Sequence, residues 1–96
     1  MKYTPEQLEQ LRTMGALGYQ VGKILNIIDF ADPSQFEKDF QNPESEVSRA
    51  YQKGADLAEF ALDVMVYEQA QSGDLKALNE YRQRKAINQK PIKKKV

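Results

Sequence analysis

Two groups of side chains in this sequence have functional chemistry, and both are suited to binding a ligand rather than to catalysis. The first lies in DPSQFEKDFQNP, residues 32 to 43, which holds Ser34, Gln35, Lys38 and Gln41. Hydroxyl, amide and ammonium groups on one short helix can hydrogen-bond to the edges of nucleic-acid bases. The alternative for Gln35 and Lys38 is that they are ordinary exposed residues of a helix.

The second group is a basic run at the end of the sequence. Its seven members, with no acid among them, are Arg82, Arg84, Lys85, Lys90, Lys93, Lys94 and Lys95. Residues 1 to 81 hold all fourteen acids and seven bases, a balance of −7. A basic run attracts an anionic partner, such as nucleic acid, a membrane surface or the acidic body of another copy. The alternative is a solvated tail that only aids solubility.

Composition argues against catalysis. The sequence has no histidine and no cysteine, which removes the commonest general base, the commonest metal ligand and every thiolate site. Asp29, Asp32 and Glu37 do not have the spacing of a calcium loop. We therefore expect a protein that is not an enzyme and has no catalytic residues, no cofactor and no metal. No apolar run approaches the ~20 residues of a bilayer span, and the start is no signal peptide, so we expect a cytoplasmic protein without a membrane partner.

The elements that must position these side chains are helices. Thr4, Asp32 and Asn42 each precede a proline, a pairing that predicts a helix start, and Gly18 and Gly73 predict helix ends. Strand-like alternation is absent over any useful length, so the fold class is all-α. We predict helices at about 5–16, 19–28, 33–41, 43–72 and 74–87. They form a single domain over 1–88, with a helix-turn-helix-like unit at 4–41, and 89–96 is a basic flexible tail.

Leu75, Leu78 and Tyr81 of the last helix are expected to face inward. The long helix before it carries a stripe of small residues (Ala50, Gly54, Ala58 and Ala61), which would let another helix approach closely. A further stripe holds Phe60, Asp63 and Tyr67. Either the last helix covers its two rings, or the stripe binds a protein partner.

Two stretches are similar to bacteriophage terminase small subunits. GYQVGKILNIIDFADPSQFEKDF, residues 18 to 40, resembles the helix-turn-helix of that family. AYQKGADLAEFALDVMVYEQAQSGDLKALNEYRQRK, residues 50 to 85, resembles the segment that follows it. The matching features are Lys53-Gly54, Gly73-Asp74, Ala77-Leu78 and the basic ending Arg82, Arg84, Lys85. Leu25 and Asp29 depart from the family, which usually has a small residue and a glycine there.

The resemblance implies a non-catalytic subunit that binds double-stranded DNA as a homo-oligomer and serves a large terminase subunit in genome packaging, in the host cytoplasm. Charge gives a competing hypothesis. Residues 29 to 46 hold six acids against Lys38, and such a surface repels a duplex unless the basic run supplies the attraction. The alternative is a helical adaptor that binds a protein partner through its acidic face or its basic tail.

Overall fold

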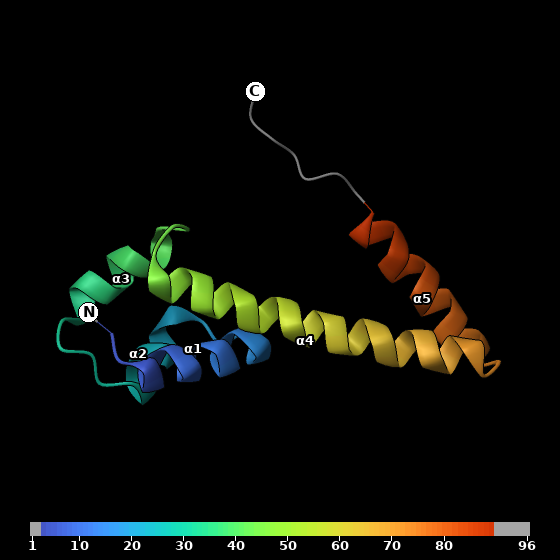
Figure 1. Cartoon of the computed structure of the whole chain (residues 1–96), viewed down its shortest axis with the longest axis horizontal. Coiled ribbons are helices and arrows are strands. Elements are labelled where there is room, and N and C mark those ends of the chain that lie inside the picture. The colour runs from blue at the N-terminus through green and yellow to red at the C-terminus, as the bar shows by residue number, and fades with distance from the viewer. Residues whose placement is uncertain (1–2, 90–96) are drawn as a thin grey trace, which may run out of the picture. The chain divides into compact units, whose positions relative to one another are not determined.

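Helices are the regular structure of this chain in the computed structural model, which describes residues 3–89 (Figure 1). The helices are α1 (Pro5–Leu17), α2 (Val21–Ile27), α3 (Pro33–Gln41), α4 (Glu46–Gln71) and α5 (Leu75–Asn88). No strand occurs among these residues, so the all-α prediction is confirmed. None of these helices is long and apolar enough to cross a membrane.

Side-chain caps start α1 and α3 where the sequence predicts them. The Thr4 hydroxyl accepts from the Gln7 N–H and the Gln7 side chain accepts from the Thr4 N–H, both over 3.0 Å, a reciprocal capping box. The Asp32 carboxylate accepts from the Gln35 N–H over 3.1 Å. Gly18 ends α1 with a φ of 73°, a left-handed conformation that favours glycine.

The predicted start of the long helix is wrong. α4 begins at Glu46 rather than at Pro43, and Asn42 ends α3 instead of capping α4. The cap is Ser45, whose hydroxyl accepts from the Ser48 N–H over 3.1 Å and donates to a carbonyl of α3. One hydroxyl thus closes the turn after α3 and starts α4, which a cap at Asn42 could not do. The other predicted ends lie within two residues of the observed ones.

The chain forms two compact units, Met1–Glu59 and Phe60–Val96. The first contains a core of nine buried side chains: Tyr3, Leu11, Met14, Ile24, Ile28, Phe30, Phe36, Val47 and Ala50. At its centre the rings of Phe30 and Phe36 stack with centroids 4.0 Å apart. This core holds α2 and α3 against α1 and so decides which face of α3 points to solvent. The single domain over 1–88 stays a prediction.

Two glycines bring α1 and α4 into backbone contact. A Cβ on Gly54 would lie 1.8 Å from the carbonyl oxygen of Arg12, and one on Gly15 would lie 1.9 Å from that of Tyr51. Both distances are far below any real contact, so only glycine fits at either position. The predicted close approach at the small-residue stripe of α4 is thus observed at Gly54.

The second unit joins the last turns of α4 to α5. Gly73 turns the chain with a φ of 98°, and the Asp74 carboxylate caps α5 by accepting from the N–H groups of Lys76 and Ala77. Val66 and Ala77 are its buried hydrophobic residues within the described chain. Leu75, predicted to face inward, is 76% exposed: it is the first residue of α5 after the cap, and the buried residue of this turn is Ala77 instead.

Candidate functional site

The solvent-facing stripe of α3 is the candidate site. Phe36 is buried and Phe40 is half-buried, so the opposite side of the helix is outward. Ser34, Glu37, Lys38 and Gln41 lie there, all exposed, at the spacing i, i+3, i+4 and i+7 of one helical face. We call these four residues the α3 stripe. Each carries a hydroxyl, carboxylate, ammonium or amide group that can hydrogen-bond to a ligand.

The other acidic residues of α3 and its cap form hydrogen bonds within the first unit. Asp32 caps the helix through the Gln35 N–H. The Asp39 carboxylate accepts from the Tyr3 hydroxyl over 2.6 Å and from the Gln35 amide over 2.9 Å. Burial and then this hydrogen bond raise the pKa of Tyr3. Of the three carboxylates in this segment, Glu37 alone therefore stands on the α3 stripe.

The structure places the three predicted α3 residues differently. Ser34 and Lys38 are exposed on the α3 stripe, as a binding role needs. Gln35 is half-buried and its amide donates to Asp39, so it braces the helix from the side. Gln41, which the sequence also offers for base edges, is exposed on the α3 stripe, and Glu37 joins it there. The spacing of Glu37 from Ser34 is the signal in the sequence that would have selected it.

The predicted basic residues of α5 have different surroundings. Arg84 is half-buried and forms ion pairs with Asp63 and Glu80, both over 3.1 Å, and its hydrogen bonds to Glu80 and Asp63 raise its pKa. Its charge is therefore largely neutralised. Arg82 and Lys85 are exposed, and the Lys85 ammonium lies 5.7 Å from the centre of the Tyr81 ring. The remaining predicted cations, Lys90, Lys93, Lys94 and Lys95, lie outside the described residues.

The predicted partner-binding stripe of Phe60, Asp63 and Tyr67 is covered in part. Asp63 accepts from Arg84 over 3.1 Å and from the Asn88 amide over 3.0 Å. The Tyr67 ring lies 5.4 Å from that of Tyr81, centre to centre. Phe60 stays 66% exposed. α5 therefore contacts the Tyr67 ring through Tyr81 but leaves it 44% exposed, so neither ring of the stripe is buried.

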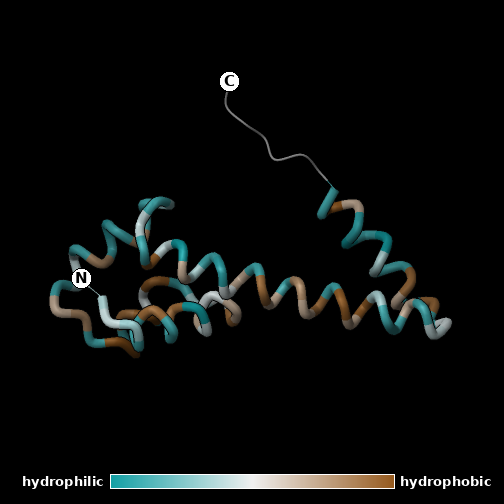
Figure 2. The backbone as a smooth tube through the Cα atoms, in the orientation of Figure 1, coloured by the Kyte–Doolittle hydropathy of each residue, from teal (hydrophilic) through white to brown (hydrophobic). Residues whose placement is uncertain are grey.

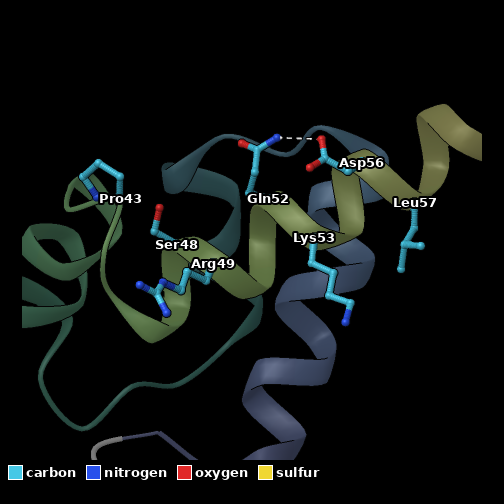
Figure 3. A pocket seen from close by; sticks show the side chains of 7 residues that line it. All are labelled: Pro43, Ser48, Arg49, Gln52, Lys53, Asp56 and Leu57. Atoms are coloured by element: carbon cyan, nitrogen blue, oxygen red, sulfur yellow. Dashed lines mark hydrogen bonds between the residues drawn. The ribbon is translucent and has the colours of Figure 1, made fainter. Parts of the chain in front are cut away.

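A hollow of about 460 Å³ lies along the first half of α4 (Figure 3). Its lining residues are Pro43, Ser48, Arg49, Gln52, Lys53, Asp56 and Leu57. All except Ser48 are exposed, and their side chains point in different directions around the helix. Gln52 donates to Asp56 over 3.0 Å, and Arg49 pairs with Glu44 over 2.8 Å. The hollow is therefore a shallow surface depression between solvated side chains rather than an enclosed binding site.

No protein-family model matches the chain, and neither the curated proteins nor the solved structures provide a match. The resemblance to terminase small subunits therefore stays a prediction from the sequence motifs alone.

Proposed function

We propose that this chain is a non-catalytic DNA-recognition subunit, similar to a phage terminase small subunit, and that several copies act on one duplex. The observation that carries the proposal is the α3 stripe, presented to solvent by a helix that the core of the first unit fixes on α1 and α2. A second short helix held in this way is the arrangement that places base-reading side chains in a major groove.

The chemistry of the α3 stripe suits base edges. Lys38 can donate to the acceptors of guanine, and Glu37 can accept from the amino group of cytosine. The Ser34 hydroxyl and the Gln41 amide can each donate and accept, and glutamine pairs with adenine. Within α3 itself the Asp39 carboxylate is held by Tyr3 and Gln35, so Glu37 is the carboxylate of this helix that would face the groove.

Phosphate contacts need more cations than α2 and α3 supply. Residues 21–41 hold Lys23 and Lys38 against four carboxylates. Affinity for a duplex comes largely from cations that meet phosphates. The densest source in the sequence is the basic run that begins at Arg82. Each copy would bind weakly, and linking several copies would multiply the weak contacts.

A salt titration with duplex DNA tests the proposal. Fluorescence anisotropy of a labelled duplex should report binding whose affinity falls by at least about tenfold between about 50 and about 200 mM salt. Removal of residues 90–96 should abolish most of the binding while keeping Asn88, which contacts Asp63. Absence of binding at the lowest salt would refute the proposed function.

A matched pair of lysine variants distinguishes a DNA contact made by the α3 stripe from general electrostatic attraction. Lys38→Ala should weaken binding more than Lys76→Ala, although both remove one exposed lysine. Gln41→Ala should change the preference among duplex sequences while leaving the salt dependence unaltered, since an amide adds no charge. Equal effects of the two lysine variants would place the DNA contact away from α3.

The second candidate function is a helical adaptor that binds another protein. The observation in its favour is Phe60, a large ring left 66% exposed. A chain that binds no duplex at low salt but forms a stable complex with a different protein, weakened by Phe60→Ala, would establish this function instead.

A further inference from the structure

A second hollow, of about 420 Å³, lies on the first unit, with side chains from the start of α2, the end of α3 and α4 around it. Ligand pockets in proteins typically span about 300–1,000 Å³, so this one can hold a group the size of a long side chain. We call it the α2–α3 hollow. It is built entirely from residues of the first unit, and Glu37 and Gln41 of the α3 stripe form part of its edge.

Aromatic and aliphatic side chains form the wall of the α2–α3 hollow. Tyr19, Val21, Phe40 and Tyr51 line it, and all four are half-buried. Most of α3 is hydrophilic (Figure 2), so the Phe40 ring is an apolar exception on that helix. The wall therefore offers apolar surface that the side chains of the first unit leave partly open, which suits a ligand with an apolar or planar body.

Contacts within the first unit hold the rings of this wall in place. The Tyr51 hydroxyl donates to the Tyr19 carbonyl oxygen over 2.8 Å. The Phe40 ring meets the Tyr51 ring edge-on, with centroids 5.0 Å apart, and stacks on the buried Phe36. Gly15 brings the backbone of α1 against that of Tyr51. A wall that is fixed before binding lowers the entropy that a ligand must overcome.

The charge of the α2–α3 hollow favours a cation. Of the described residues that line it, Glu37 alone carries a formal charge, and it forms no hydrogen bond or ion pair within the described chain. The faces of aromatic rings attract cations as well. Tyr19 shows this attraction, because the Lys23 ammonium lies 4.1 Å from the centre of its ring. An unpaired carboxylate beside aromatic rings is therefore complementary to a cation with an apolar stem.

The polar edge of the α2–α3 hollow suits a guanidinium group in particular. The Glu37 carboxylate and the exposed amides of Gln20 and Gln41 all offer acceptor oxygens there. A guanidinium is planar, has N–H donors and no acceptor, and stacks on aromatic rings. An arginine side chain can therefore lie against the rings while its donors reach the oxygens of the edge.

We propose that the α2–α3 hollow binds an arginine side chain of a partner protein. The guanidinium meets Glu37, and the stem lies against Tyr19, Phe40 and Tyr51. A basic segment of a protein is favoured over free arginine, because the free amino acid adds a carboxylate that Glu37 repels. The first unit also carries ten acids against six bases, so it attracts a basic segment at a distance.

This inference goes beyond the proposed function and does not need DNA. It has one consequence for the α3 stripe, because an arginine that engages Glu37 and Gln41 uses groups that a duplex would otherwise contact. The two ideas are tested separately. Arginine binding without DNA binding would keep this inference and remove the proposed function, and DNA binding without arginine binding would do the reverse.

Short peptides test the proposal on the full chain. The probes have blocked ends and one central residue between two glycines, which is arginine, citrulline or lysine. Citrulline has the shape of arginine without its charge. Two-dimensional NMR of the isotope-labelled chain should show saturable shifts at Val21, Glu37 and Gln41 with the arginine peptide, at about millimolar affinity. The citrulline peptide should bind about tenfold more weakly or worse, and the lysine peptide about threefold more weakly.

Two carboxylate variants distinguish the α2–α3 hollow from general electrostatic attraction. Glu37→Gln keeps the size of the side chain and should weaken binding of the arginine peptide about tenfold. Glu68→Gln is the matched control: it also removes one exposed carboxylate, but on α4 in the second unit. Its affinity should equal that of the wild type. Tyr19→Leu should weaken binding about threefold or more, because it removes a ring face, with folding checked by circular dichroism.

Several results would overturn the proposal. One is the absence of saturable shifts at these residues with the arginine peptide up to about 20 mM. Another is equal weakening by Glu37→Gln and Glu68→Gln. Equal binding of the citrulline peptide would assign the hollow to an uncharged ligand, and equal binding of the lysine peptide would assign it to any cation. Shifts at these residues that follow the protein concentration alone would assign it to a second copy of this chain.

Discussion

Among single residues, Tyr3 makes the contact that ties the start of the described chain to α3. Its hydroxyl donates to the Asp39 carboxylate over 2.6 Å, and its ring meets Phe30 and Phe36 edge-on. Tyr3→Phe keeps the ring and removes one donor from the carboxylate. We expect the free energy of unfolding to fall by about 1–2 kcal/mol, as for a partly exposed hydrogen bond to a charged group. Urea denaturation measures this, and an unchanged value would mean that the bond does not stabilise the fold.

The same contact predicts a pH dependence. Burial and the hydrogen bond to Asp39 raise the pKa of Tyr3 above the ordinary tyrosine value of about 10. The folded chain therefore favours the protonated phenol. Its contribution to stability is fully present below about pH 10 and is lost as pH rises towards the raised pKa of the folded state. Between about pH 9 and about pH 11 the wild type should lose more stability than Tyr3→Phe in parallel urea titrations. Equal losses would contradict the raised pKa.

Among the elements, the close contact between α1 and α4 depends on glycine. A Cβ at Gly54 would lie 1.8 Å from the backbone oxygen of Arg12, and backbone cannot rotate away as a side chain can. Gly54→Ala should therefore push the helices apart and lower the free energy of unfolding by about 2–3 kcal/mol. The core of the first unit would loosen with them, because Val47 and Ala50 enter it from the same helix. Chemical denaturation followed by circular dichroism measures the change.

The matched control for this change is another helical glycine. Gly22 in α2 is exposed and has no atom within 4 Å of an added Cβ. Gly22→Ala should raise the free energy of unfolding by about 0.5–1 kcal/mol, because alanine loses less conformational freedom on folding. Opposite signs for the two variants are the expected outcome. A loss of stability in both, or in neither, would contradict the close approach of α1 and α4.

The sequence predicts the end of a helix well where the residues that set it lie within one turn of that end. The start of α3 follows from Asp32, which caps it, and Pro33, which suits its first position. The start of α4 was missed because two capping residues compete, and Ser45 is favoured by its additional bond to α3. The α3 stripe was only partly predicted for a similar reason. Periodicity shows which residues share a face, but a contact from Tyr3, distant in sequence, turns Asp39 inward and draws Gln35 with it.

For the whole molecule, the distribution of buried side chains is uneven. Nine of the eleven buried hydrophobic residues of the described chain lie in the first unit and two in the second. Burial of apolar surface is the main favourable term in folding, so the first unit can hold itself together while the second depends on further contacts.

This unevenness predicts how the two units open in solution. Amide hydrogen exchange reports local opening, and few buried contacts mean a low free energy of opening. Amides of residues 60–71 and 75–88 should exchange faster than those of α1 and α3, because the second unit has two buried hydrophobic residues against nine in the first. Equal protection of the two units would contradict this expected difference in local stability.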